Sequence, residues 1–283
     1  VPWAVTTVLI FTNFHVNDTM TIVIASVAYF AFELMNTFTA IPYNSMGSLA
    51  TNNDADRRSI NISRNIGGCV GTAIGAVACM PLLKLFGALD AKGNLIDAAG
   101  SRGFFLAASV MGVICIIGCL IHYFTTKERV EPENDSDEHI GMIEAFKVMY
   151  SYKPFVMNTL YILVYGIINL LIMSCLTYYC TYVMGSTAAV TPIQAVYLLM
   201  SLLTSAVAGA IDRKLGRKKT MLLAAVFYVL GKVWFIFDPY SMGAIYVNAI
   251  TMGVASAITF IMFNTNRNNL SDLIEWHGGR RMD

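Results

Sequence analysis

Two charged residues stand where the sequence is otherwise apolar, and they are the first candidates for chemistry. Glu33 lies inside an apolar run, and Arg64 follows the polar turn that leads into the next run. A charged side chain at such a depth in hydrocarbon costs several kcal/mol unless it is paired or faces a water-filled cavity. Each of the two is therefore a candidate functional residue.

The neighbours of Glu33 extend it into a polar stripe. Glu33, Thr37 and Ala40 share one helix face because they are spaced by four and three residues, and Asn36 lies beside that face. The stripe could turn toward a central cavity. Alternatively, it makes hydrogen bonds that pack the helix against a neighbour.

Arg64 belongs to a second one-faced cluster, which also contains Asn61 and Asn65. A guanidinium can fork onto a pair of hydroxyls or a carboxylate with fixed geometry, which suits an oriented sugar or acid. The alternative is that Arg64 extends to the nearby membrane interface.

The basic pair Arg57 and Arg58 has a different setting, because it follows the acidic residues Asp54 and Asp56 in a polar stretch. We expect both arginines in a solvated loop, where they set the topology. An inter-helix ion pair with Asp54 or Asp56 is a second role that we consider for them.

Lys232 is the one charge in the apolar run 220–237. Extension to the interface and a functional role are both open for it. Other polar residues of the second half could bind sugar hydroxyls or stack on sugar rings, or could serve as interface anchors and interhelical bonds. They are Tyr165, Asn169, Tyr178, Tyr179, Gln194, Asn248, Asn264 and Asn266.

The composition indicates whether these residues lie in water or in a lipid bilayer. Hydrophobic residues make up 56% of the 283 residues and charged residues only 13%, and the mean hydropathy is +0.60. These values predict a polytopic membrane protein in a lipid bilayer, with no nucleic-acid partner. The six cysteines all lie in apolar runs. The four histidines are scattered, and the sequence contains no H-E-x-x-H or G-x-S-x-G motif. These features argue against an enzyme or a metal site.

The apolar runs predict an all-α transmembrane helix bundle in two halves. We expect the run 20–41 to end at Pro42, where a helix loses a hydrogen bond, and the run 1–14 is too short to cross a bilayer. The remaining spans are 60–86, 103–124, 154–183, 192–211, 220–237 and 242–264. The predicted domains are part of an N-terminal bundle (1–125), a polar linker (126–152) with a short surface helix near 142–149, and part of a C-terminal bundle (153–283).

Lysine and arginine are distributed unevenly between the two sides of these spans. The side that contains the linker carries most of them, whereas the loops of the other side contain only Lys92 and Arg102. The positive-inside rule therefore predicts that the linker and both ends of this chain are cytoplasmic.

Three stretches carry a resemblance to a known family. The run IPYNSMGSLATNNDADRRSINISRN and the run SDLIEWHGGRRMD resemble segments of the glycoside-pentoside-hexuronide cation symporters, the melibiose permease group of the major facilitator superfamily. The basic run DRKLGRKK is similar to a loop common to many facilitators. The resemblance implies a partial facilitator fold with about eight of roughly twelve spans, from about the third to the tenth helix.

The resemblance also implies roles for individual residues. Thr37 falls on a position of the family's cation site and Arg64 on an arginine of its sugar pocket, whereas Ala40 replaces an aspartate and Asn44 a tryptophan. We expect substrate contacts from Arg64, Asn36 and Asn44, and cation coupling through Thr37 and Glu33. Asn269 stands where the family often has aspartate. The expected cytoplasmic motif comprises Asp212, Arg213, Gly216, Arg217, Lys218, Asp272, Glu275, Gly279 and Arg280.

The implied function is cation-coupled symport of a sugar or glycoside by alternating access, with Na⁺ or H⁺ as the coupling ion and no other cofactor. The protein would be a monomeric, multi-pass transporter of the cell (inner) membrane. The alternatives are a facilitator for another small polar solute and a membrane scaffold that transports nothing.

Overall fold

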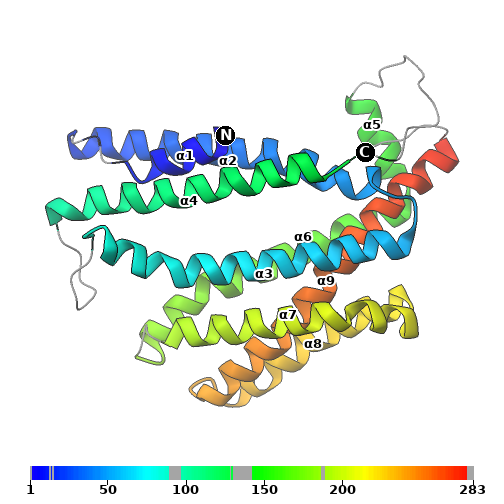
Figure 1. Cartoon of the computed structure of the whole chain (residues 1–283). Helices are drawn as coiled ribbons and strands as arrows, with labels where there is room; N and C mark the ends of the chain where they lie inside the picture. Colours follow the sequence, from blue (N-terminus) through cyan, green and yellow to red (C-terminus); the bar gives the residue numbers. More distant parts are fainter. Residues whose placement is uncertain are drawn as a thin grey trace. The chain divides into compact units, whose positions relative to one another are not determined.

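A computed structural model describes residues 2–12, 14, 16–88, 97–127, 129, 142–185 and 189–278. Within these residues the protein is built from helices, turns and irregular segments and contains no strand. The prediction of an all-α protein is confirmed. Figure 1 labels the helices in chain order.

Among the described residues, four helices precede the linker, and five follow it or lie at its end. The first set is α1 (Pro2–Ile10), α2 (Asp18–Leu49), α3 (Asp54–Leu85) and α4 (Asp97–Thr125). The second set is α5 (Met142–Ser151), α6 (Lys153–Tyr182), α7 (Val190–Leu215), α8 (Arg217–Phe237) and α9 (Met242–Gly278).

Six of the described helices are long and apolar enough to cross a membrane. The segments are Thr19–Leu49, Arg102–Thr125, Lys153–Tyr182, Val190–Leu215, Arg217–Phe237 and Met242–Ile274. At 1.5 Å per residue each exceeds or approaches the ~30 Å of a hydrocarbon core. The predicted span 60–86 coincides with α3, which is not among these six, so a crossing there stays a prediction.

The prediction that a span ends at Pro42 is wrong. Helix α2 continues through Pro42 to Leu49, because a proline inside a membrane helix removes one backbone hydrogen bond without forcing the chain to turn. The turn comes after Leu49 instead, where Thr51 Oγ1 accepts a hydrogen bond from the Asn53 amide (3.1 Å) and Asn53 Oδ1 accepts one from the Ala55 amide (2.9 Å). These polar side chains satisfy backbone donors at the start of α3.

The chain divides into two compact units, 1–46 with 74–128 and 47–73 with 129–283. The first unit contains α1, most of α2, the second half of α3, and α4. There α1 packs closely on α4, where Gly112 faces Ala4 and Val8, and Trp3 packs against Phe32 of α2. The predicted domain boundaries at 125 and 153 stay a prediction.

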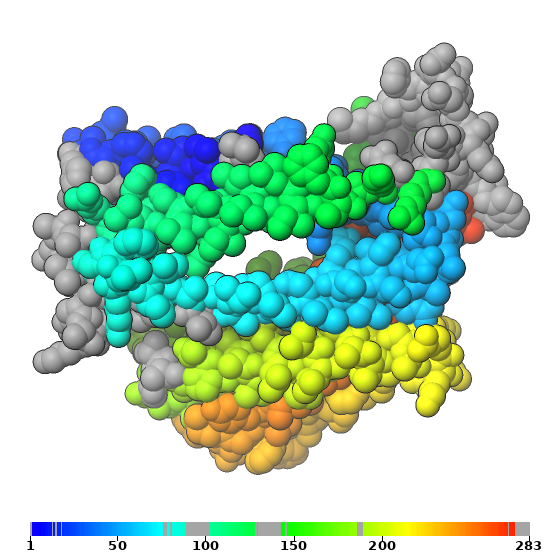
Figure 2. Space-filling model, in the orientation of Figure 1, coloured from blue at the N-terminus to red at the C-terminus, as the bar shows by residue number. Residues whose placement is uncertain are grey.

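Helix α9 forms the centre of the second unit. Its residues Ala255, Ile258 and Ile261 are fully buried against Ala208 of α7 and Ala224 of α8. The first half of α3 lies along α7, as the adjoining cyan and yellow surfaces in Figure 2 show. This arrangement brings polar residues that are far apart in the sequence to the faces of α9.

Helix α6 has the surface expected of a membrane helix, because its large apolar side chains are exposed. They include Leu160, Leu163, Val164, Ile167, Leu170 and Leu171. Such a surface suits lipid rather than water.

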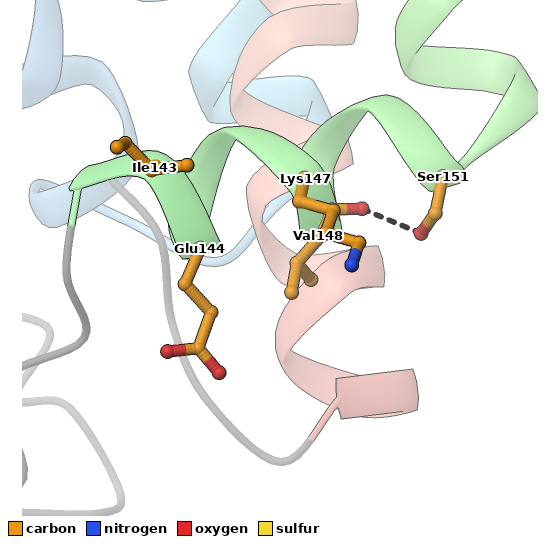
Figure 3. Close-up of a pocket in the computed structure, with 5 residues that line it drawn as sticks. All are labelled: Ile143, Glu144, Lys147, Val148 and Ser151. Carbon is orange, nitrogen blue, oxygen red and sulfur yellow. Dashed lines mark hydrogen bonds between the residues drawn. The ribbon is translucent and has the colours of Figure 1, made fainter.

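The short helix predicted near 142–149 is confirmed as α5, and its place on the membrane surface stays a prediction. Figure 3 shows the five residues that line a hollow beside α5, Ile143, Glu144, Lys147, Val148 and Ser151, all of which belong to that helix. Ser151 Oγ donates to the Val148 carbonyl oxygen at 2.6 Å. Because no other described element contributes to this hollow, it does not gather groups for chemistry. The linker residues 130–141 lie outside the described residues.

Candidate functional site

Six charged residues of the second unit interlock where α3 begins, and we call them the charged cluster: Asp54, Arg57, Arg58, Asp212, Arg217 and Asp272. They come from the start of α3, the end of α7, the start of α8 and the end of α9. The cluster therefore ties the turn between α2 and α3 to three helices of the second half.

Arg57 is the most buried member of the charged cluster, with 1% of its side chain exposed. Its two terminal nitrogens both donate to Asp272, and the Nη2–Oδ1 distance is 3.0 Å. Its Nε donates to the Thr51 carbonyl oxygen at 2.8 Å, and its Nη1 to that of Asn268 at 3.0 Å. The expectation of a solvated loop is therefore wrong for Arg57, because a forked pair with a distant carboxylate compensates for its burial.

The other four charges alternate in a closed ring. Arg58 donates to Asp54 (2.9 Å) and pairs with Asp212 (2.8 Å). Arg217 pairs with the same two carboxylates, at 2.9 Å for Asp54 and 3.1 Å for Asp212. The predicted partner Asp54 is correct for Arg58, but the pair lies within α3 and not between helices. The expectation of a solvated loop is wrong for Arg58 as well, because it lies in a helix with 11% of its side chain exposed.

Asn269 links Arg57 to the ring. Its Oδ1 accepts from Arg57 Nη1 at 3.1 Å, and its Nδ2 donates to Asp54 Oδ1 at 2.5 Å. An aspartate at this position could accept the hydrogen bond from Arg57 but could not donate to Asp54. The departure from the family pattern therefore fits the neighbours that Asn269 has here.

The surroundings of Asp54 favour its charged form. Burial acts to raise the pKa of its carboxyl group, but hydrogen bonds from Asn269 and Arg217 and the charges of Arg217 and Arg58 outweigh this, so the pKa lies below its ordinary value. The carboxyl group of Asp54 is accordingly ionised near neutral pH.

A line of neutral polar contacts continues from the cluster along α3. Asn61 donates to Thr265 Oγ1 of α9 at 3.1 Å, and Asn65 donates to Ser205 Oγ of α7 at 2.6 Å. Cys69 contacts Ser201 of α7 at 3.4 Å. We call these residues the polar seam.

Sequence reasoning missed the α7 and α9 partners of the polar seam. A signal was present, since Asn61, Asn65 and Cys69 recur every four residues and Ser201 and Ser205 have the same spacing. Such spacing places polar groups on one helix face. Small polar residues also allow close helix approach in membranes.

Arg64 lies beside the polar seam and is half buried. Its Nη1 donates to Asn61 Oδ1 at 3.4 Å, so the predicted grouping of Arg64 with Asn61 is confirmed. Asn65 points to Ser205 instead. Contact of Arg64 with a substrate stays a prediction.

The predicted residues of α2 belong to the first unit, whereas the charged cluster and Arg64 belong to the second. Thr37 Oγ1 donates to the Glu33 carbonyl oxygen at 2.9 Å, which confirms that both share a helix face. Both side chains are exposed, and those of Asn36 and Asn44 are half buried. Their roles in cation coupling and substrate contact stay predictions.

The predicted cytoplasmic motif is brought together in part. Asp212, Arg217 and Asp272 enter the charged cluster, whereas Arg213 and Lys218 are exposed. Gly216 forms the turn between α7 and α8 with φ of 77°, a conformation that side chains other than glycine rarely adopt. Glu275 lies in α9, and Gly279 and Arg280 lie outside the described residues.

Lys232 has a partner inside the second unit. Its Nζ donates to Asn248 Oδ1 of α9 at 2.5 Å. Asn248 also lines a cavity of ≈ 20 Å³ together with Gln194 and Tyr197 of α7. This contact joins α8 to α9, and a functional role of Lys232 stays a prediction.

The thiols and other possible metal ligands are dispersed. No group of three or more His, Cys, Asp or Glu side chains that could hold a metal ion occurs in the part of the chain that the structure describes. The cysteines are free, and Cys69 and Cys180 are buried.

Comparison with known proteins gives a consistent result. The whole chain, residues 1–283, matches the model of a family described as MFS/sugar transport protein. It is 25% identical over 233 residues to the isoprimeverose transporter of Lactiplantibacillus pentosus, covering 82% of this chain and 47% of that protein. It is 25% identical over 288 residues to the uncharacterized symporter YjmB of Bacillus subtilis, covering 99% and 59%.

A third relative is the raffinose carrier protein of Pediococcus pentosaceus, 20% identical over 259 residues, which are 90% of this chain and 40% of that carrier. The chain thus spans about half the length of the curated relatives it matches.

Proposed function

Because the chain belongs to the MFS/sugar transport protein family, we propose that the protein carries a sugar or glycoside across a cell membrane in symport with Na⁺ or H⁺. The family match confirms the resemblance seen in the sequence. The names of the relatives, a transporter, a carrier and symporters, support transport rather than an enzymatic reaction. Alternating access of two helix bundles around a midplane site is the mechanism we propose.

The charged cluster is the observation that carries this proposal. It joins the start of α3, from the predicted N-terminal bundle, to α7, α8 and α9 of the predicted C-terminal bundle. Its three carboxylates and three guanidinium groups form a balanced set. We propose that this set closes the cytoplasmic entrance and that it separates when the site opens to the cytoplasm.

The energetics of such a set suit a reversible closure. Ion pairs gain little net free energy when water can replace each partner, whereas removing one partner of a buried pair costs about 3–5 kcal/mol. A balanced set can therefore open as a whole into water at modest cost. An incomplete set would leave a charge without compensation in the closed state.

The test is uptake of radiolabelled sugars and glycosides into membrane vesicles that contain the protein expressed from its whole coding sequence. We expect saturable uptake that collapses when the Na⁺ gradient or the pH gradient is removed, and the gradient that matters identifies the coupling ion. Uptake that neither saturates nor responds to either gradient would contradict symport and favour a channel or a scaffold.

The orientation is proposed on the distribution of lysine and arginine. A reporter inserted near Asp135 should be accessible from the cytoplasm, and one near Lys92 from the outside. The reverse pattern would refute a cytoplasmic position for the charged cluster. We further propose that the transporter acts as a monomer, which size determination in detergent would test.

A further inference from the structure

Four exposed cations surround the turn between α7 and α8, and we call them the basic patch: Arg213, Lys214, Lys218 and Lys219. The first two belong to the last turn of α7, and the other two follow Arg217, the first residue of α8. Figure 1 shows α7 and α8 as neighbours that are joined at this end. The basic patch is therefore a compact set of positive charges from two helices.

The basic patch is distinct from the charged cluster, although the two alternate along the same turn. Asp212 and Arg217 are largely buried and make ion pairs of the cluster. The ion pairs of the described residues all belong to the cluster and include no member of the patch. The first turn of α8 contains no acidic residue. The charge of the patch is thus not balanced by an ion pair within the described residues.

The length of the helices and of their connection places the basic patch at the surface of the bilayer. The span Arg217–Phe237 has 21 residues and is about 31 Å long, which matches the hydrocarbon core, so its first residues lie at headgroup level. Gly216 alone separates this span from the one that ends at Leu215. A connection of one residue cannot carry the neighbouring side chains far from a headgroup layer that is roughly 5–8 Å thick.

The exposed surface of α8 continues from the patch as an apolar stripe of Leu222, Val226 and Val229. These side chains are 64%, 44% and 65% exposed. They follow Lys218 at intervals of four, four and three residues, which keeps them on one helix face. An exposed apolar face on a membrane-spanning helix suits lipid chains. This face of α8 therefore offers positive charge at headgroup level and apolar side chains at the level of the acyl chains.

We propose that the basic patch and the apolar stripe bind an anionic phospholipid of the bilayer, with its headgroup phosphate between the cations of α7 and α8. This inference goes beyond the proposed sugar transport and does not depend on it. Clusters of lysine and arginine next to a membrane span attract anionic headgroups, and a guanidinium can also bind a phosphate through two hydrogen bonds. A zwitterionic phospholipid carries its own cation beside its phosphate, so it compensates the patch less well.

The test compares two lipids with the same acyl chains, the anionic dioleoylphosphatidylglycerol and the zwitterionic dioleoylphosphatidylcholine. Native mass spectrometry of the purified protein, expressed from its whole coding sequence and titrated with each lipid in detergent, measures the Kd of the first bound lipid. We expect the wild type to bind the anionic lipid about 10-fold more tightly. Replacing all four residues of the basic patch by Gln should reduce this preference to less than about 2-fold.

A matched control removes the same charge elsewhere. It replaces one arginine and three lysines by Gln, all of them exposed: Lys127, Arg129, Lys147 and Lys153. This variant should keep the preference of the wild type. An equal loss in both fourfold variants would show that only the net charge matters, and it would overturn the assignment to the patch.

A smaller change keeps the test decisive if the fourfold patch variant does not fold. Lys218→Gln combined with Lys219→Gln removes half of the charge, and it should leave a preference of about 3-fold. An unchanged preference in this double variant would contradict the contribution of α8 to the site.

A further arm separates the lipid from soluble phosphate compounds. Glycerol 3-phosphate presents the phosphate without acyl chains, so an equimolar amount should not displace phosphatidylglycerol. Displacement at that concentration would overturn lipid docking in favour of a soluble phosphate ligand. Equal affinities of the wild type for both lipids would overturn the proposal as well, and they are the result expected if another segment of the whole protein covers the patch.

Discussion

The charged cluster and the Lys232 contact show two ways of keeping charges in a membrane protein. In the cluster each guanidinium meets a carboxylate from another part of the chain, and Arg57 is almost completely buried as a result. Lys232 meets only an amide oxygen among the described residues. The cluster therefore compensates buried charge with opposite charge, whereas a single neutral hydrogen bond joins Lys232 to the neighbouring helix α9.

The largest effect on stability should come from removing Arg57, the buried partner of the Arg57–Asp272 pair. Arg57→Ala leaves Asp272 without its forked partner. The expected loss of unfolding free energy is about 3 kcal/mol, at the lower end of the range for a broken buried pair because Asp272 keeps partial contact with water. Denaturant unfolding of purified protein in detergent measures this loss. Lys214→Ala, at an exposed lysine of α7, should change it by less than about 0.5 kcal/mol, and equal losses for both variants would refute a structural role of the pair.

Arg64 sharpens the comparison because it lies beside the polar seam, outside the cluster, and is predicted to contact the substrate. Arg64→Lys keeps the charge and removes the planar fork, so substrate binding should weaken by roughly 10-fold to 100-fold with little change in stability. Binding at saturating cation concentration measures this effect. Arg102→Lys makes the same change at an exposed arginine of α4 and should bind like the wild type. Unchanged affinity in Arg64→Lys would mean that Arg64 contacts the interface and not the substrate.

The smallest effect concerns the pH dependence of the cluster. The pKa of Asp54 is lowered in the folded protein, so its ion pairs contribute stability that is present above the ordinary value of 3.8 and is lost as the pH falls through the lower folded-state value. The stability advantage of wild type over Asp54→Asn should therefore be constant near neutral pH and should shrink below about pH 4. Thermal unfolding of both proteins as a function of pH measures it, and an advantage that grows on acidification would contradict the lowered pKa.

Local sequence patterns predicted the features that depend on neighbouring residues. The all-α fold, the helix at 142–149, the Asp54–Arg58 pair and the Asn61–Arg64 contact all follow from spacings of a few residues. These spacings place side chains on one face before any packing is known.

The features that were mispredicted depend on residues far away in the chain. Arg57 looked solvated because its carboxylate partner lies 215 residues further along. Pro42 was predicted to end the helix because a proline cannot donate a backbone hydrogen bond, and this is visible in the sequence. The membrane surroundings that tolerate a proline inside a helix are not visible there. The partner of Lys232 depends on the close approach of α8 and α9 at Gly231, and a single glycine does not reveal which helix it faces.

Gly216 forms a very short connection between α7 and α8, which limits how these two helices can move relative to each other. It alone separates Leu215, the last residue of α7, from Arg217, the first residue of α8. Asp212 and Arg217 bond across this joint, with Arg217 Nε donating to Asp212 Oδ1 at 3.1 Å. While this ion pair is intact, it restricts the angle between α7 and α8, so a rotation of one helix is passed on to the other.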